Sequence, residues 1–213
     1  EQVSLHVKAS LDEELIEGSR IYPFSNETPV CWFPAHHVVT NEQMLVHRPL
    51  RFSSFGFYEP TSSGVAANFS SRRACESGIL ELIERDALLL HWLCHIPARA
   101  VVESISPLMG NLLAWCKNWG IEIKCYDITT DNGVPVVLAV STNVENRGLF
   151  PVGAVFIGCA ARNSIIKAAE HAILEAVQLL EGLLLVNGDP SELPGISEHI
   201  THYLVDESSE HFK

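Results

Sequence analysis

The chain has 213 residues, 47% of them hydrophobic, and its formal net charge is −12. This composition supports one sizeable core or two small ones. The acidic balance argues against generic binding to nucleic acid or to anionic lipid. No apolar run reaches the roughly 20 residues of a membrane span. The six cysteines are scattered without a CxxC pair, which is typical of reduced thiols in a cytoplasmic protein and not of a disulfide frame or zinc site.

The first part of the chain is predicted to hold only peripheral structure. A short strand is expected at residues 3–7 and an acidic helix at about 10–17. Residues 22–58 are rich in Pro, Asn, Thr and aromatic residues, which predicts loops and short strands over a core. His36 and His37 are adjacent, so their side chains diverge, and no carboxylate or third histidine lies at ligand spacing. We expect surface or hydrogen-bonded histidines and not a metal site.

A small, polar segment, EPTSSGVAANFS, occupies residues 59–70 and leads directly into a helical pattern. A Gly/Ser-rich turn at a helix N-terminus can bind an anion through its free backbone N–H groups. The alternative is an ordinary capping loop with Ser70 or Ser71 as the N-cap. Neither a GxxxxGK[ST] nor a GxGxxG motif is present. The segment is therefore a candidate only because acidic residues follow it.

The helix predicted at residues 70–94 is apolar around its whole circumference, which predicts a buried helix. Its polar exceptions Ser77, Glu81 and Glu84 fall at i, i+4 and i+7 and share one face, with Arg85 at the edge of that face. Two carboxylates one turn apart on a buried helix repel each other and lose hydration. We therefore expect a cation between them, supplied by Arg85 or by a bound metal.

The middle of the chain predicts one helix and a set of strands. An amphipathic helix is expected over residues 106–119, with Pro107 at its first position and Gly120 as its stop. Asp-Asn-Gly at residues 131–133 is a hairpin signal. Strands are predicted at residues 121–129, 134–141 and 152–159.

A second long helix is predicted at residues 163–185, with Ser164 as its N-cap. It too is apolar around most of its circumference. Its polar exceptions His171, Glu175 and Gln178 repeat the i, i+4, i+7 spacing of the first helix. In one interpretation Glu175 and Gln178 are partly solvated groups on an edge helix. The repeated spacing favours the other, in which two helices face one site.

Together these elements predict a layered domain of the α+β class, with α/β as the alternative. The strands are expected to form a mixed sheet, and the two long buried helices to pack on one side of it with their polar stripes inward. We expect a single domain over residues 1–213, incomplete at its C-terminus.

Three segments of the chain carry a resemblance to a known family. They are TSSGVAA at residues 61–67, the pattern Ser77-x3-Glu81-x2-Glu84–Arg85, and the later ExxQ at residues 175–178. They resemble the signature of the YcaO family, and the match extends from about Trp32 to the end of the chain.

The resemblance implies an ATP- and Mg²⁺-dependent reaction on a ribosomally made precursor peptide. In that family a backbone amide oxygen is phosphorylated and then leaves as phosphate. Attack by a neighbouring Cys, Ser or Thr side chain gives a thiazoline or oxazoline, whereas an external sulfur or amine nucleophile gives a thioamide or an amidine. The scattered cysteines favour a cytoplasmic enzyme. Because no leader-peptide-binding module is visible in the sequence, we expect a leader-binding partner protein to present the peptide, and a homodimer stays open.

Carried over by motif, the resemblance implies a set of site residues. The Mg²⁺ ligands would be Glu81, Glu84 and Glu175, in keeping with the preference of this cation for oxygen. The ATP pocket would add Ser62, Ser63, Gly64, Ser77, Arg85 and Gln178. Arg85, which would offset charge on the transferring phosphoryl group, and Glu84 are the predicted catalytic residues.

The chain departs from the family pattern at four positions. Ser63 stands where the family often has Asn, and Lys167 where some members have an acidic residue. His171 stands where azoline-forming members commonly have Arg, and Arg162 where many have His. A non-catalytic YcaO-like scaffold that binds peptide or a partner is therefore a second hypothesis. A carboxylate-bridged iron or manganese protein would need ExxH pairs on its helices, and the sequence has none.

Overall fold

The computed structural model describes residues 32–47, 62–101, 106–145 and 155–185. The chain divides into two compact units, Glu1–Ser62 and Ser63–Lys213, and each is described by itself. The elements predicted at residues 3–7 and 10–17 lie outside the described residues. The expectation of one domain over the whole chain stays a prediction.

The described part of the first unit is a short hairpin. Strand β1 (Trp32–His36) pairs antiparallel with β2 (Gln43–His47). In the turn between them, His37 Nδ1 accepts hydrogen bonds from the backbone N–H groups of Val39 at 3.3 Å and Thr40 at 3.1 Å. The prediction of short strands is confirmed in this stretch, and His37 is a hydrogen-bonded surface histidine.

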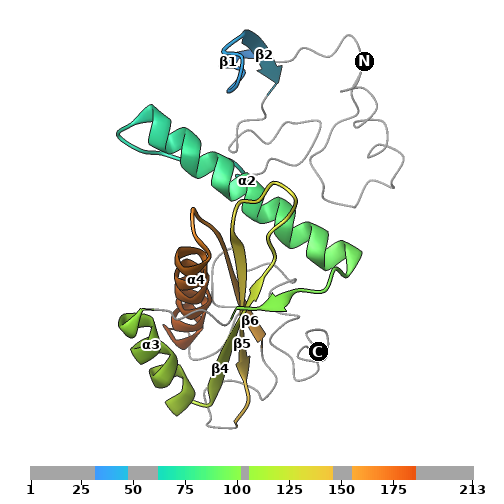
Figure 1. Ribbon diagram of the computed structural model, residues 1–213. Coiled ribbons are helices and arrows are strands. Elements are labelled where there is room, and N and C mark those ends of the chain that lie inside the picture. Colours follow the sequence, from blue (N-terminus) through green and yellow to red (C-terminus); the bar gives the residue numbers. More distant parts are fainter. Residues whose placement is uncertain (1–31, 48–61, 102–105, 146–154, 186–213) are drawn as a thin grey trace, which may run out of the picture. The chain divides into compact units, whose positions relative to one another are not determined.

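The second unit is an antiparallel sheet covered by helices (Figure 1). Its elements in chain order are α2 (Ser71–Cys94), β3 (Arg99–Ala100), α3 (Pro107–Asn118), β4 (Ile121–Asp127), β5 (Val136–Asn143), β6 (Val155–Ala161) and α4 (Ile165–Leu185). The strand order is β3-β4-β5-β6, and every described pairing is antiparallel. The α+β class is confirmed, whereas the strands described here do not form the expected mixed sheet.

The local signals read from the sequence define several ends of these elements. Pro107 occupies the first turn of α3, and Gly120, with φ +79°, follows its end. Gly133, with φ +71°, closes the turn between β4 and β5. The Ser164 hydroxyl accepts a hydrogen bond from the Lys167 N–H at 3.3 Å and caps α4.

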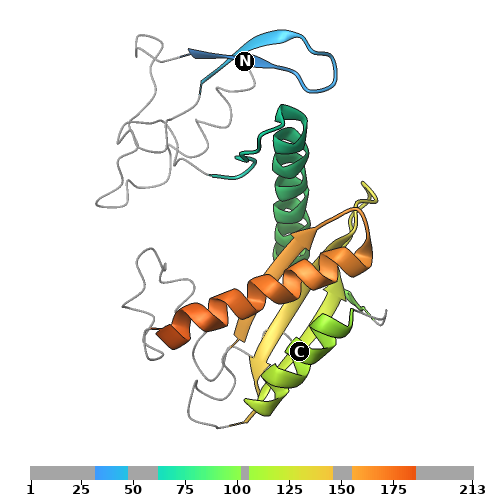
Figure 2. The same ribbon diagram turned by 90° about the vertical axis from the view of Figure 1, so that its left-hand side faces the viewer.

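The long helices cover opposite faces of the sheet (Figure 2). One face of β5 and β6, which includes Val137 and Phe156, packs with α3 and α4. The other face, which includes Val136 and Cys159, packs with Ala87 of α2. The expectation of both helices on one side is therefore wrong. Side chains alternate along a strand, and both faces of these two strands are apolar, so each face needs its own covering layer.

Helix α4 lies very close to the sheet because the residues between them are small. Its buried face carries Ala168, Ala169, Ala172, Ile173 and Ala176. A Cβ placed on Gly158 of β6 would collide with the Ala172 carbonyl oxygen. This close approach fixes α4 firmly against β6.

Helix α2 is not the buried helix that its composition predicted. Only Gly78 and Ala87 of its 24 residues are buried. Large apolar side chains are exposed along its length, namely Ile79, Leu82, Leu89, Leu90, Trp92 and Leu93. The reason is geometric, since α2 contacts β5 and β6 along one side. Among the described residues, no helix has the length and apolar character required to cross a membrane.

Candidate functional site

The site is built on the outer edge of β6, which is the last strand of the described sheet. Cys159 and Ala161 are two residues apart, so their N–H groups point to the same side, away from β5. Backbone N–H groups at a sheet edge need another partner when they are buried. Both residues are buried, and side-chain carboxylates supply those partners.

Two glutamates from the two long helices meet these edge N–H groups. Glu175 of α4 accepts a hydrogen bond from the Cys159 N–H through Oε2 at 2.9 Å. Glu84 of α2 accepts one from the Ala161 N–H through Oε2 at 3.2 Å. Since α2 and α4 lie on opposite faces of the sheet, its edge brings the two carboxylates together. The other oxygen of each carboxylate has no hydrogen-bond partner within the described residues.

The Glu84 carboxyl has an unusual protonation equilibrium. Its pKa is raised to about 6, chiefly by burial and also by the negative charge of Glu175, whereas the hydrogen bond from the Ala161 N–H lowers it. The positive charges of Arg162 and Arg85 also lower this pKa. The pair therefore favours a proton or a cation between its members.

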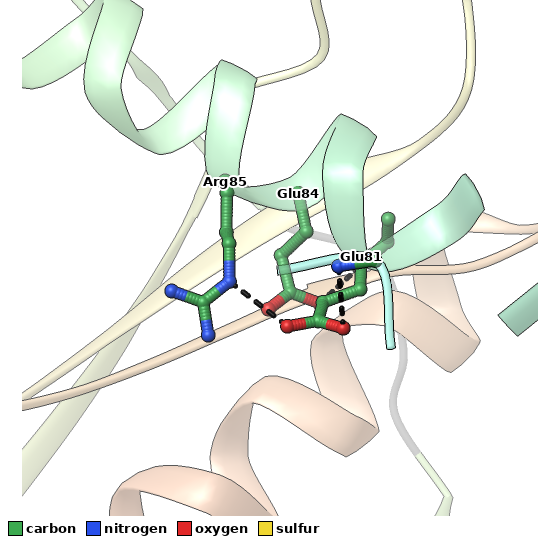
Figure 3. Close-up of polar contacts among 5 residues, drawn as sticks. Glu81, Glu84 and Arg85 are labelled. Carbon is green, nitrogen blue, oxygen red and sulfur yellow. Dashed lines mark hydrogen bonds and ion pairs between the residues drawn. The ribbon is translucent and has the colours of Figure 1, made fainter. Parts of the chain in front are cut away.

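Glu81, one turn before Glu84, occupies a different environment. Its Oε2 accepts a hydrogen bond from the Gly64 N–H at 3.1 Å, and its Oε1 accepts one from Arg85 Nε at 3.0 Å. Figure 3 shows the side chains of Glu81, Glu84 and Arg85 projecting from the same side of α2. A Cβ on Gly78 would lie 2.7 Å from the Gly64 carbonyl oxygen, and Gly64 has φ +76°. The loop therefore lies directly against the helix at two glycines.

The remaining predicted site residues differ in how exposed they are to solvent. Ser62 is the last residue of the first unit and is exposed, whereas Ser63 is half-buried. Ser77 on α2 and Gln178 on α4 are exposed. The structure thus brings together two groups: Gly64, Glu81 and Arg85 in one, and Glu84 with Glu175 in the other.

Two participants escaped the sequence analysis. The first is the backbone of β6. Its run of small residues, GCAA at residues 158–161, is visible in the sequence, but only the structure shows how closely α4 approaches it at Gly158. The second is Arg162, which stood out only as a departure from the family pattern. Its half-buried side chain lies where its charge affects both Glu84 and His171, because it lowers the pKa of each.

The chemistry of the donor set fits Mg²⁺. Within the described ranges, no three His, Cys, Asp or Glu side chains lie close enough together to hold a metal by themselves. Mg²⁺, however, keeps several waters and is commonly held by one or two carboxylates together with substrate phosphates. Glu84 and Glu175 provide two carboxylates with unused oxygens, whereas both oxygens of Glu81 already accept hydrogen bonds.

Comparison with known families identifies the class of protein. The model of the YcaO cyclodehydratase family, described as ATP- and Mg²⁺-binding, matches residues 4–212. The chain belongs to this family, and ATP and Mg²⁺ are the cofactors of the family. A curated relative, an uncharacterized protein in the tfuA 3′ region of Rhizobium leguminosarum bv. trifolii, is 31% identical over 170 residues, which cover 70% of this chain and 39% of the relative.

Solved structures share the fold. A heterocyclase in complex with substrate and cofactor has a TM-score of 0.73 at 22% identity, covering 97% of this chain and 28% of that chain. The Escherichia coli microcin synthetase McbBCD complex with pro-MccB17 bound has a TM-score of 0.66 at 19% identity, covering 85% and 48%. YcaO from Methanopyrus kandleri, bound with AMPPCP and Mg²⁺, has a TM-score of 0.60 at 20% identity, covering 90% and 52%. The chain thus spans about a quarter to a half of these proteins.

Proposed function

We propose that the protein activates a peptide backbone amide with ATP and Mg²⁺ and converts Cys, Ser or Thr to an azoline in a ribosomally made precursor peptide. One observation carries the proposal: two helices from opposite faces of the sheet deliver Glu84 and Glu175 to one edge of β6. Membership of the YcaO cyclodehydratase family over residues 4–212 supports it.

In this proposal Glu84 and Glu175 hold Mg²⁺ through their unused oxygens. The bound metal would supply positive charge to the phosphate oxygens of ATP. The raised pKa of Glu84, about 6, fits this role because a carboxylate destabilised by burial and by a nearby like charge is stabilised by a cation. Glu81, predicted as a third ligand, would have to exchange one of its hydrogen bonds for the metal.

The segment before α2 has a positioning role in the proposal. The Gly64 N–H and the Arg85 guanidinium hold Glu81 between them. Ser62, Ser63 and Gly64 would contact the nucleotide, and Ser77 and Gln178 would line the same pocket. Arg85, exposed over about half of its side chain (52%), would offset negative charge on the phosphoryl group.

The proposed chemistry balances as a dehydration driven by ATP. The amide oxygen of the peptide forms a bond to the terminal phosphorus, and ADP leaves. The thiol or hydroxyl of the adjacent residue then adds to the amide carbon and gives up its proton. Phosphate departs with the former amide oxygen, and the amide nitrogen gives up its proton as the C=N bond of the azoline forms. The peptide thereby loses the elements of one water.

The first experiment measures ATP binding by calorimetry with and without Mg²⁺, on the unchanged protein and on Glu84→Gln. We expect binding that requires Mg²⁺ and is lost in the variant. Glu76→Gln is the matched control, because Glu76 lies two turns earlier on α2 and is an exposed partner of Arg72 at 2.9 Å. Full Mg²⁺-dependent binding by Glu84→Gln would refute the metal assignment. No binding at any Mg²⁺ concentration by the unchanged protein would favour the scaffold hypothesis.

The product decides between azoline formation and the thioamide or amidine alternatives. Mass spectrometry of the peptide would show loss of one water for an azoline, and exchange of oxygen for sulfur for a thioamide.

The peptide and a leader-binding partner are proposed in keeping with the McbBCD complex, which was solved with pro-MccB17 bound. A cytoplasmic location is proposed because the described cysteines are all free. A homodimer stays a prediction.

A further inference from the structure

Arg162 is the first residue after β6, and its backbone fixes where it lies. Its N–H donates to the Pro135 carbonyl oxygen at 3.0 Å and so continues the ladder between β5 and β6. Its side chain turns back, and Nη1 donates to the Ala161 carbonyl oxygen at 2.7 Å. The guanidinium is thus held against the end of β6.

This places the guanidinium on the same edge as the carboxylate pair. In an antiparallel ladder the N–H and C=O of one residue point to the same side of the strand. The Ala161 N–H donates to Glu84, and the Ala161 carbonyl accepts from Arg162. Both charged groups therefore lie on the outer edge of β6, away from β5.

The two arginines of the site differ in whether their charge is paired with a carboxylate. Arg85 forms an ion pair with Glu81 at 3.0 Å. Arg162 forms no ion pair with any described residue, and its one described side-chain hydrogen bond is to a neutral carbonyl. A guanidinium carries five N–H donors. Within the described part of the chain, Arg162 therefore combines unused N–H donors with a positive charge that forms no ion pair, beside two carboxylates.

We propose that Arg162 binds the terminal phosphate of the nucleotide at this edge. The inference rests on the proposed function and adds a residue that the motif did not assign. The fork of a guanidinium matches two phosphate oxygens at once. With Mg²⁺ held by Glu84 and Glu175, Arg162 would take phosphate oxygens that the metal leaves free. The nucleotide phosphates would then be bound both through the metal on the two glutamates and directly by the Arg162 guanidinium.

The test compares ATP with ADP, because only ATP carries the terminal phosphate. Calorimetric titrations with Mg²⁺ would be made on the unchanged whole protein, Arg162→Gln and Arg162→Lys. Charge-assisted hydrogen bonds of about 1.5–3 kcal/mol correspond to a loss of about tenfold to a hundredfold. We expect that loss for ATP in Arg162→Gln, a smaller loss in Arg162→Lys, and little change for ADP in either variant.

Arg99→Gln is the matched control, because Arg99 is an exposed arginine on β3, at the other end of the sheet. It should leave both affinities unchanged. Equal losses for ATP and ADP in Arg162→Gln would overturn the inference, since they would indicate a structural role, and so would full ATP affinity. If Arg162→Gln does not fold, the ATP-to-ADP ratio of Arg162→Lys decides. Absence of Mg²⁺-dependent ATP binding in the unchanged protein would instead overturn the proposed function, and the inference with it.

Discussion

Helices α2 and α4 carry polar residues at the same spacing and each delivers a glutamate to the edge of β6, yet they pack in different ways. Helix α4 buries a continuous face of alanines and Ile173. Helix α2 buries only Gly78 and Ala87. The comparison teaches that a helix can place a carboxylate at a sheet edge through one small packing contact and a hydrogen bond, without being buried.

The two helices differ in how tightly they are packed on the sheet. Helix α4 and the sheet form the rigid part, because Gly158 allows the backbones to touch and close packing tolerates little change. Helix α2 is held on one side by Ala87 and by the contact between Gly64 and Gly78. Several of its large apolar residues stay exposed, among them Leu89 and Leu93.

The largest effect expected from this comparison concerns stability. Ile173 on α4 is fully buried, whereas Leu93 on α2 is 69% exposed. Ile173→Ala should lower the free energy of unfolding by about 3 kcal/mol, because it leaves a cavity in the core. Leu93→Ala, the matched control, should change it by less than about 0.5 kcal/mol. Chemical denaturation measures both, and similar losses would mean that α2 is as buried in solution as α4.

A smaller effect tests the close approach of α4 to β6. Gly158→Ala should cost about 2 kcal/mol, because the new methyl group overlaps the backbone of α4 at Ala172. Gly110→Ala is the matched control, since a Cβ on Gly110 of α3 has no neighbour within 4 Å. That change should stabilise the protein by about 0.5–1 kcal/mol, because Gly is a poor helix former. Thermal unfolding measures the stability of both variants. If Gly158→Ala is as stable as the unchanged protein, α4 can move away from β6 at no cost.

The smallest effect concerns the ionisation of Glu84 without Mg²⁺. Its pKa in the folded protein, about 6, lies above the ordinary value of 4.5. The folded state therefore binds the proton more tightly, and stability falls as pH rises from about 4.5 to 6. Glu84→Gln cannot ionise, so it should be more stable than the unchanged protein by about 1–2 kcal/mol above pH 6 and not at pH 4.

The control for this last prediction is the addition of Mg²⁺. Because the metal needs the ionised carboxylate, saturating Mg²⁺ should stabilise the unchanged protein more than Glu84→Gln. Unfolding curves at pH 4 and pH 7, with and without Mg²⁺, give the free energy of unfolding of each protein under all four conditions. A pH-independent difference between the two proteins would contradict the raised pKa.

The sequence predicted the local structure of the second unit well. Pro107, Gly120, Gly133 and Ser164 lie at the ends and turns that they indicated, because their effects act within a few residues. The motif also identified the family. The burial of α2 was predicted wrongly, because apolar residues around a helix do not say how many of its sides meet another layer.

What the sequence determined alone is therefore short-range: the helices α2, α3 and α4 and the strands β4, β5 and β6 of the second unit, their end signals, and the motif residues Glu81, Glu84 and Glu175. The tertiary structure decided that α2 and α4 lie on opposite faces and that Glu84 and Glu175 meet at the edge of β6. It also placed Arg162 beside them. The physical reason is that these contacts depend on strand order and on which backbone N–H groups a sheet edge leaves unpaired, and neither is written in the spacing of residues along the chain.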